Sequence, residues 1–121
     1  MAARAPWKRD VLVEHGPHLD TTGGKVWIAA HTLCDFFEDR QEELGLCGGE
    51  GRALHALEIG AGCGWLGICL ARNVPGLSVV LTEQEAGLAH LERNIEVNRA
   101  AGLPLDGVSV AALDWSDRAG Y

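Results

Sequence analysis

The stretch Ala56–Gly67, which reads Ala-Leu-Glu-Ile-Gly-Ala-Gly-Cys-Gly-Trp-Leu-Gly, decides the fold of this chain. Its apolar beginning is interrupted by the acid Glu58, and four glycines then fall within eight positions. This order predicts a buried strand, a tight turn and the beginning of a helix. Because glycine carries no Cβ, a nucleotide-like ligand can closely approach the backbone of such a turn. The stretch therefore predicts half of a cofactor-binding site.

Size and charge limit the classes of protein to consider. The 121 residues are 47% hydrophobic and 22% charged, which suits one small soluble domain with its own core. The net charge of −7 argues against a nucleic-acid partner, because phosphate binding needs clustered Lys and Arg. Only Arg4, Lys8 and Arg9 cluster, and their simplest interpretation is a solvated tail.

Cysteine usage and hydropathy favour a cytoplasmic location without a membrane partner. None of the four cysteines belongs to a C-x-x-C pair, and no histidine lies at ligand spacing from them, so neither a disulfide framework nor a zinc site is expected. No apolar run reaches the roughly 18–20 residues that span a bilayer. The first residues, 1–9, lack the apolar centre of a secretory signal. The cysteines are Cys34, Cys47, Cys63 and Cys69.

Helical and strand-like segments alternate along the chain. The predicted strands cover 11–14, 54–59, 77–82 and 108–113, and the predicted helices cover 25–39, 65–72 and 86–101. In the first helix a stripe of apolar residues is widened on both sides, so we expect that helix to be well buried. The stripe is Trp27, Ala30, Cys34 and Phe37, and the flanking residues are Ile28, Leu33 and Phe36.

This alternation predicts an α/β fold with a parallel sheet and right-handed crossovers. Ligands of such sheets bind at the carboxyl ends of the strands. Three distinctive segments fall at those ends: Gly60–Gly64, Glu83 and Asp114–Trp115. We therefore expect them to form one site.

Two cofactors fit the glycine turn, and a turn without any ligand is the third possibility. Residues 62–67 satisfy G-x-G-x-x-G, with Glu83 about 20 residues further on, as in dinucleotide-binding proteins. The alternative pattern begins earlier, at Glu58, whose carboxylate can organise a cationic amine beside the turn. S-adenosylmethionine has an amine but no phosphate, so this acid suits it better than it suits NAD.

The other candidates each have a structural alternative. The Glu83 carboxylate can accept both hydroxyls of a ribose, or it can stabilise the N-terminus of the following helix. Trp115 can cover an adenine face and Asp114 can accept from an adenine amine, but Trp115 can equally be a core or loop anchor. Asn94 and Asn98 are explained by solvated positions or local backbone caps.

The order of these motifs resembles the seven-β-strand (class I) methyltransferases of the protein-lysine methyltransferase group. The resemblance extends from about Thr22 to Trp115, which is most of the chain, and the blocks on either side of the glycine turn are more specific than the turn itself. The residues that carry it are Thr22–Ala30, Leu57–Ile68, Leu81–Glu83, Asn94, Asn98 and Leu113–Trp115.

The resemblance implies S-adenosylmethionine as the cofactor and a Rossmann-like doubly wound parallel sheet as the fold. It implies cofactor contacts for Trp27, Gly60, Ala61, Gly62, Glu83 and Trp115. Pattern alone would assign Trp27 to core packing. The family usually has Asp where Glu83 stands, so the carboxylate is displaced by one methylene here.

Members of the family continue beyond the point where this chain stops. The resemblance therefore implies only the N-terminal portion of the domain, with three core strands, flanking helices and an N-terminal helix. We expect one partial domain: an extension over 1–21, a helix and loop over 22–51, and a cofactor-binding βαβαβ unit over 52–121. The strand at 54–59 would then have an open apolar edge, which favours aggregation unless a partner covers it.

We expect an S-adenosylmethionine-dependent methyltransferase that modifies a lysine of a protein substrate, present here as its incomplete cofactor-binding part. The alternatives are a fragment of an NAD-binding oxidoreductase and a methyltransferase-like remnant without catalysis. No general base can be named within these residues, and we expect weak or absent activity from them alone. The oligomeric state is not predicted.

Overall fold

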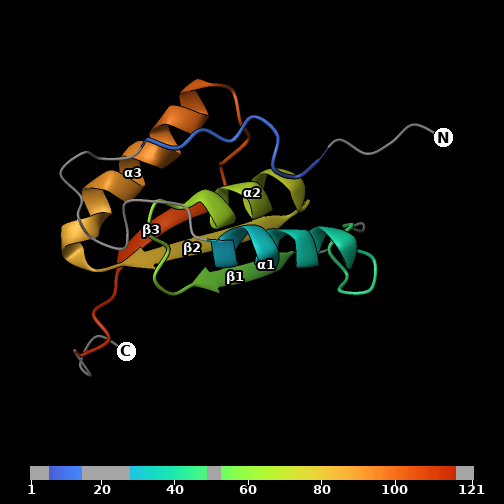
Figure 1. Cartoon of the computed structure of the whole chain (residues 1–121), viewed down its shortest axis with the longest axis horizontal. Helices are drawn as coiled ribbons and strands as arrows, with labels where there is room; N and C mark the ends of the chain where they lie inside the picture. Colours follow the sequence, from blue (N-terminus) through green and yellow to red (C-terminus); the bar gives the residue numbers. More distant parts are fainter. Residues whose placement is uncertain (1–5, 15–27, 49–52, 117–121) are drawn as a thin grey trace.

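The computed structural model describes residues 6–14, 28–48 and 53–116. Its elements are α1 (Ile28–Asp39), β1 (Leu54–Glu58), α2 (Trp65–Asn73), β2 (Leu77–Glu83), α3 (Glu85–Ala100) and β3 (Val108–Ala112) (Figure 1). The three strands form a parallel sheet in the order β1-β2-β3. The expected α/β fold is confirmed, and the predicted bounds from 54 onward differ from these by one residue at most. Among the described helices, none is long and apolar enough to cross a membrane.

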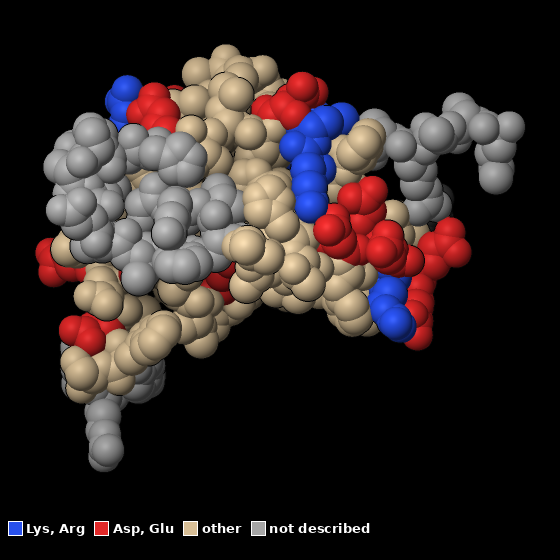
Figure 2. Space-filling view, viewed as in Figure 1, with Lys and Arg blue, Asp and Glu red and all other residues tan. Residues whose placement is uncertain are grey.

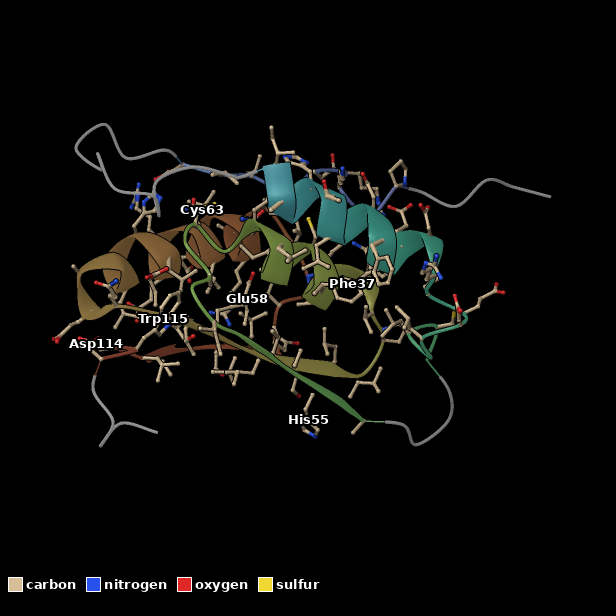
Figure 3. All side chains as sticks on the ribbon, turned by 60° about the horizontal axis from the view of Figure 1, so that its bottom comes forward. Phe37, His55, Glu58, Cys63, Asp114 and Trp115 are labelled. Atoms are coloured by element: carbon tan, nitrogen blue, oxygen red, sulfur yellow. The ribbon has the colours of Figure 1, made fainter. Side chains whose placement is uncertain are left out.

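The helices lie on one face of the sheet. Side chains of β2, α2, α3 and β3 share one buried cluster, whose central members include Leu81, Ile68, Leu91 and Val108. Figure 3 shows the helices together above the strands, whereas His55 of β1 points to the other side. The strands follow one another across the sheet in chain order. Right-handed crossovers that all run in one direction place their connecting helices, here α2 and α3, on the same face.

The opposite face of the sheet is open in the described residues. Along β1 the alternation of the strand turns Leu57 outward, where 62% of its surface is exposed, and Ile59 just beyond the strand is 56% exposed.

Helix α1 packs on one side only. Ala30, Cys34 and Phe37 contact the cluster formed with α2, as the stripe predicts. The expectation that α1 is well buried is wrong, because Ile28 is 84% exposed and Phe36 is 44% exposed. Among the described elements α1 packs chiefly against α2, so the flanks of its stripe have no second surface to cover them. Trp27 lies outside the described residues.

The prediction of a strand at residues 11–14 is wrong: this segment is not part of the sheet and instead binds to α3. Asn98 Oδ1 accepts from the Leu12 amide at 2.8 Å, and Asn98 Nδ2 donates to the Leu12 carbonyl at 2.8 Å. Asn94 Oδ1 accepts from the Glu14 amide at 2.6 Å. Both asparagines are fully buried, so their interpretation as solvated positions is wrong. They supply the backbone partners that a neighbouring strand would otherwise supply.

The solvated-tail interpretation is also wrong for the described part of the basic cluster. Trp7 is only 4% exposed and packs with α1 and α2. Lys8 Nζ lies 2.9 Å from a carboxylate oxygen of Asp35, and Arg9 donates to Asn73 at 3.2 Å. On the face shown in Figure 2, the basic side chains of the described residues lie beside acidic ones.

We predict that N98A lowers the free energy of unfolding by about 2–3 kcal/mol, because two backbone groups of Leu12 lose their partners and a buried cavity is left. Urea denaturation of the full chain measures this. The matched control is E96A, an exposed position on the same helix, which should change the value by less than about 0.5 kcal/mol. Equal effects of N98A and E96A would show that the hydrogen bonds between Asn98 and Leu12 do not contribute to the free energy of unfolding.

Candidate functional site

The turn between β1 and α2 has the backbone that only glycine readily adopts. Gly60, Gly62 and Gly64 have φ angles of 71°, 60° and 83°. Between them, the Ala61 amide donates to the Thr82 carbonyl at 2.8 Å. The turn is therefore held at the carboxyl ends of β1 and β2, where the sequence pattern predicts a site.

Two of the four glycines allow close packing behind the turn. A Cβ at Gly64 would lie 2.6 Å from the Leu91 side chain, and one at Gly67 would collide with Leu81. These contacts bring α2 against α3 and β2. The remaining glycines, Gly60 and Gly62, belong to the part of the turn that faces the candidate site.

Glu83, the last residue of β2, binds two backbone amides. Its Oε2 accepts from Gly62 at 2.9 Å and its Oε1 accepts from Gln84 at 2.9 Å. The carboxylate thus joins the glycine turn to the residue that precedes α3. Each carboxylate oxygen has a further lone pair, so these bonds leave acceptor capacity for ligand hydroxyls. The ribose role stays a prediction.

Glu58 ends β1 beneath α2, as Figure 3 shows, and its carboxyl group is largely buried. Its Oε1 is buried and has no hydrogen-bond partner among the described residues. Burial raises the pKa of Glu58 from its usual value near 4.5 to about 7, opposed by the Gly67 amide and reinforced by the charge of Glu83. A buried acceptor without a partner is costly, and a cationic or N–H group brought to the turn would relieve that cost.

Trp115 follows β3 and lies against the turn. It is 67% exposed, so it is not a core residue, and a Cβ at Gly60 would lie 3.4 Å from its ring. The neighbouring Asp114 Oδ1 accepts from the Ser116 amide at 2.9 Å and from its hydroxyl at 2.7 Å. These bonds lower the pKa of Asp114. An exposed indole beside a glycine turn provides a flat surface on which a ring can stack.

The predicted site residues of the described part therefore gather at one end of the sheet. They are Gly60, Ala61, Gly62, Glu83 and Trp115, with Glu58 behind them. The sequence patterns assign no individual role to two further contributors. Thr82 is buried and donates to the Glu58 carbonyl at 2.7 Å, and Gly87 lies against the Glu83 side chain.

A family model for lysine methyltransferases matches residues 9–120. The chain belongs to this lysine methyltransferase family. It is 32% identical over 91 residues to EEF1A lysine methyltransferase 3 of Mus musculus, a match that covers 75% of this chain and 34% of the relative. It is 33% identical over 84 residues to protein-lysine N-methyltransferase EFM6 of Saccharomyces cerevisiae, covering 63% of this chain and 34% of the relative.

The chain spans about a third of the length of the curated relatives that it matches. A similar solved structure is that of the N,N-8-amino-8-demethyl-D-riboflavin dimethyltransferase RosA from Streptomyces davawensis. The TM-score is 0.44 at 19% identity, and the match covers 69% of this chain and 24% of RosA. Membership of the lysine methyltransferase family favours the methyltransferase interpretation of the glycine turn over the dinucleotide one.

We predict that Glu58 makes stability fall as pH rises. Its pKa is higher in the folded than in the unfolded chain, so the folded state holds the extra proton between about pH 4.5 and 7. The contribution of Glu58 to the free energy of unfolding is therefore largest below pH 4.5. It falls by up to about 3 kcal/mol by the time the pH exceeds 7.

The variant E58Q stays neutral, so the difference in unfolding free energy between it and the wild-type chain should grow in favour of E58Q from pH 5 to pH 8. Urea denaturation at both pH values measures it. The exposed acid Glu92 provides the control E92Q, which should show a constant difference from wild type. A constant difference for E58Q as well would mean that its carboxyl titrates as in the unfolded chain.

Proposed function

We propose that this chain is the cofactor-binding part of an S-adenosylmethionine-dependent methyltransferase that modifies lysine side chains of a protein substrate. The observation that carries the proposal is the buried Oε1 of Glu58 behind a glycine turn, an oxygen that has no hydrogen-bond partner in the part of the chain that the structure describes. Family membership and the names of the relatives support the reaction class and a protein substrate. We propose that residues 1–121 form one partial domain. Its parts are an extension over 1–21, a helix and loop over 22–51, and a βαβαβ unit over 52–121.

The two carboxylates at the turn suit a cationic ligand that carries no phosphate. Glu83 accepts from the Gly62 amide, and Glu58 lies close enough to feel the charge of Glu83. Two acidic groups at the turn are a poor setting for a pyrophosphate but a good one for an amine and a diol. When bound, S-adenosylmethionine supplies a methyl group made electrophilic by the sulfonium to which it is attached.

The roles of the individual residues follow from that fit. Glu58 would stabilise the positive charge of the methionine portion, and Gly60, Ala61 and Gly62 would let that portion lie on the backbone. Glu83 would hold the ribose hydroxyls with its remaining lone pairs. Trp115 would cover the adenine. Trp27, which lies outside the described residues, is proposed as a further contact from the family resemblance alone.

The chain's own groups would act mainly by positioning and charge. A cation beside Glu58 favours its ionised form, so binding near pH 6.5 should release a proton from that carboxyl. Holding the donor in one orientation supplies much of the rate of such transfers, and no general base is assigned among these residues. The four cysteines are free thiols, which supports a cytoplasmic location.

We predict that the full chain binds S-adenosylhomocysteine and not NADH when the two are compared by isothermal titration calorimetry. Binding of NADH alone would support the oxidoreductase alternative. Binding of neither would support a remnant without a cofactor and would contradict the proposal.

The variant W115A tests the adenine contact in the same assay. Loss of stacking should weaken S-adenosylhomocysteine binding by about tenfold, while the unfolding free energy changes by less than about 0.5 kcal/mol because Trp115 is exposed. The matched control F36A removes another exposed aromatic side chain, on α1, and should leave the affinity unchanged. Equal affinities for W115A and wild type would remove Trp115 from the site.

A further inference from the structure

Gly87 lies in the first turn of α3, directly against the side chain of Glu83. A Cβ built at Gly87 would lie 2.6 Å from Glu83 Cγ and 3.5 Å from Glu83 Cδ. Carbon atoms of side chains do not approach so closely, so any larger residue at this position would force Glu83 to move. Glu83 cannot move freely, because its carboxylate binds Gly62 and Gln84.

The backbone of Gly87 gives no other reason for a glycine. It lies within α3, and it is not among the residues with positive φ. Its amide donates to the Gln84 carbonyl at 2.9 Å, as alanine would also do. At a helical position alanine is the more stabilising residue. The feature that glycine provides here is the absence of a side chain beside Glu83.

We propose that Gly87 is a positioning residue for the Glu83 carboxylate. The space above Gly87 accepts the Cγ methylene of Glu83, so the side chain folds back across the first turn of α3 and reaches the Gly62 amide. Through this contact Gly87 sets where the acid at the end of β2 meets the turn. Only its consequence for cofactor affinity rests on the proposed function.

A double-mutant cycle on the full chain without cofactor tests the contact itself. Its members are wild type, G87A, E83A and E83A/G87A, compared by thermal unfolding and by amide exchange at Gly62. When G87A is added to E83A, it should raise the Tm by about 4 °C, because the helix gains propensity and nothing is displaced. When G87A is made in the wild-type chain, it should give no such gain and should speed Gly62 exchange about tenfold, because the bond to Glu83 is lost.

Calorimetry with S-adenosylhomocysteine then tests the consequence. G87A should weaken binding about tenfold, in line with the loss of a hydrogen bond to a charged group. The control A89G changes helix propensity at an exposed position of the same helix and should stay within about twofold of wild type.

The outcomes separate this inference from the proposed function. If the wild-type chain binds no cofactor, the proposed function fails, while the cycle and the Gly62 exchange still decide the role of Gly87. Equal Tm gains with and without E83A, together with unchanged Gly62 exchange, would overturn the inference. If G87A does not fold but E83A/G87A does, the clash is with Glu83 and the inference is supported; if neither folds, it is overturned.

Discussion

The carboxylate of Glu83 is the interaction on which the candidate site depends. With one oxygen on Gly62 and the other on Gln84, it joins the glycine turn after β1 to the beginning of α3. Without it the turn would be held to β2 mainly by the Ala61 amide. A charged acceptor shared by two backbone amides is both stronger and more directional than a neutral one. The turn is therefore preorganised before any ligand arrives.

The remaining packing serves to keep that edge of the sheet in place. Helices α2 and α3 share one core over β2, and the close approach of Leu91 to Gly64 brings α3 against the turn. Asn94 and Asn98, on the buried side of α3, fasten residues 11–14 along the same helix. Figure 1 shows this N-terminal segment lying along α3, so a stretch far away in sequence becomes part of the support.

What the sequence predicts well is local. The order of an apolar run, an acid and spaced glycines is enough to predict β1, the turn and α2, because turn backbone and burial depend on neighbouring residues. The grouping of Glu83 and Trp115 with the turn follows from a general property of parallel sheets. Glu58 is recognisable from its place before the glycines, although its unpartnered oxygen is not.

What the sequence does not predict depends on contacts between distant segments. Asn94 and Asn98 look like surface residues until residues 11–14 are placed on them. The apolar flanks of α1 suggest burial, but only packing shows that one side of the helix finds a partner. No sequence pattern explains Gly87, and the reason for a glycine within α3 becomes visible only from its contact with the Glu83 side chain.

We propose that the glycine turn, Glu58, Glu83 and Trp115 together form one binding site for S-adenosylmethionine. An NMR titration of the uniformly labelled chain with S-adenosylhomocysteine tests it most directly. We expect saturable shifts of the Gly60, Gly62 and Gln84 amides and of the Trp115 indole, while the amides of β3 at Ser109 and Val110 do not shift. Shifts confined to other surfaces, or an unchanged spectrum at saturating ligand, would contradict it.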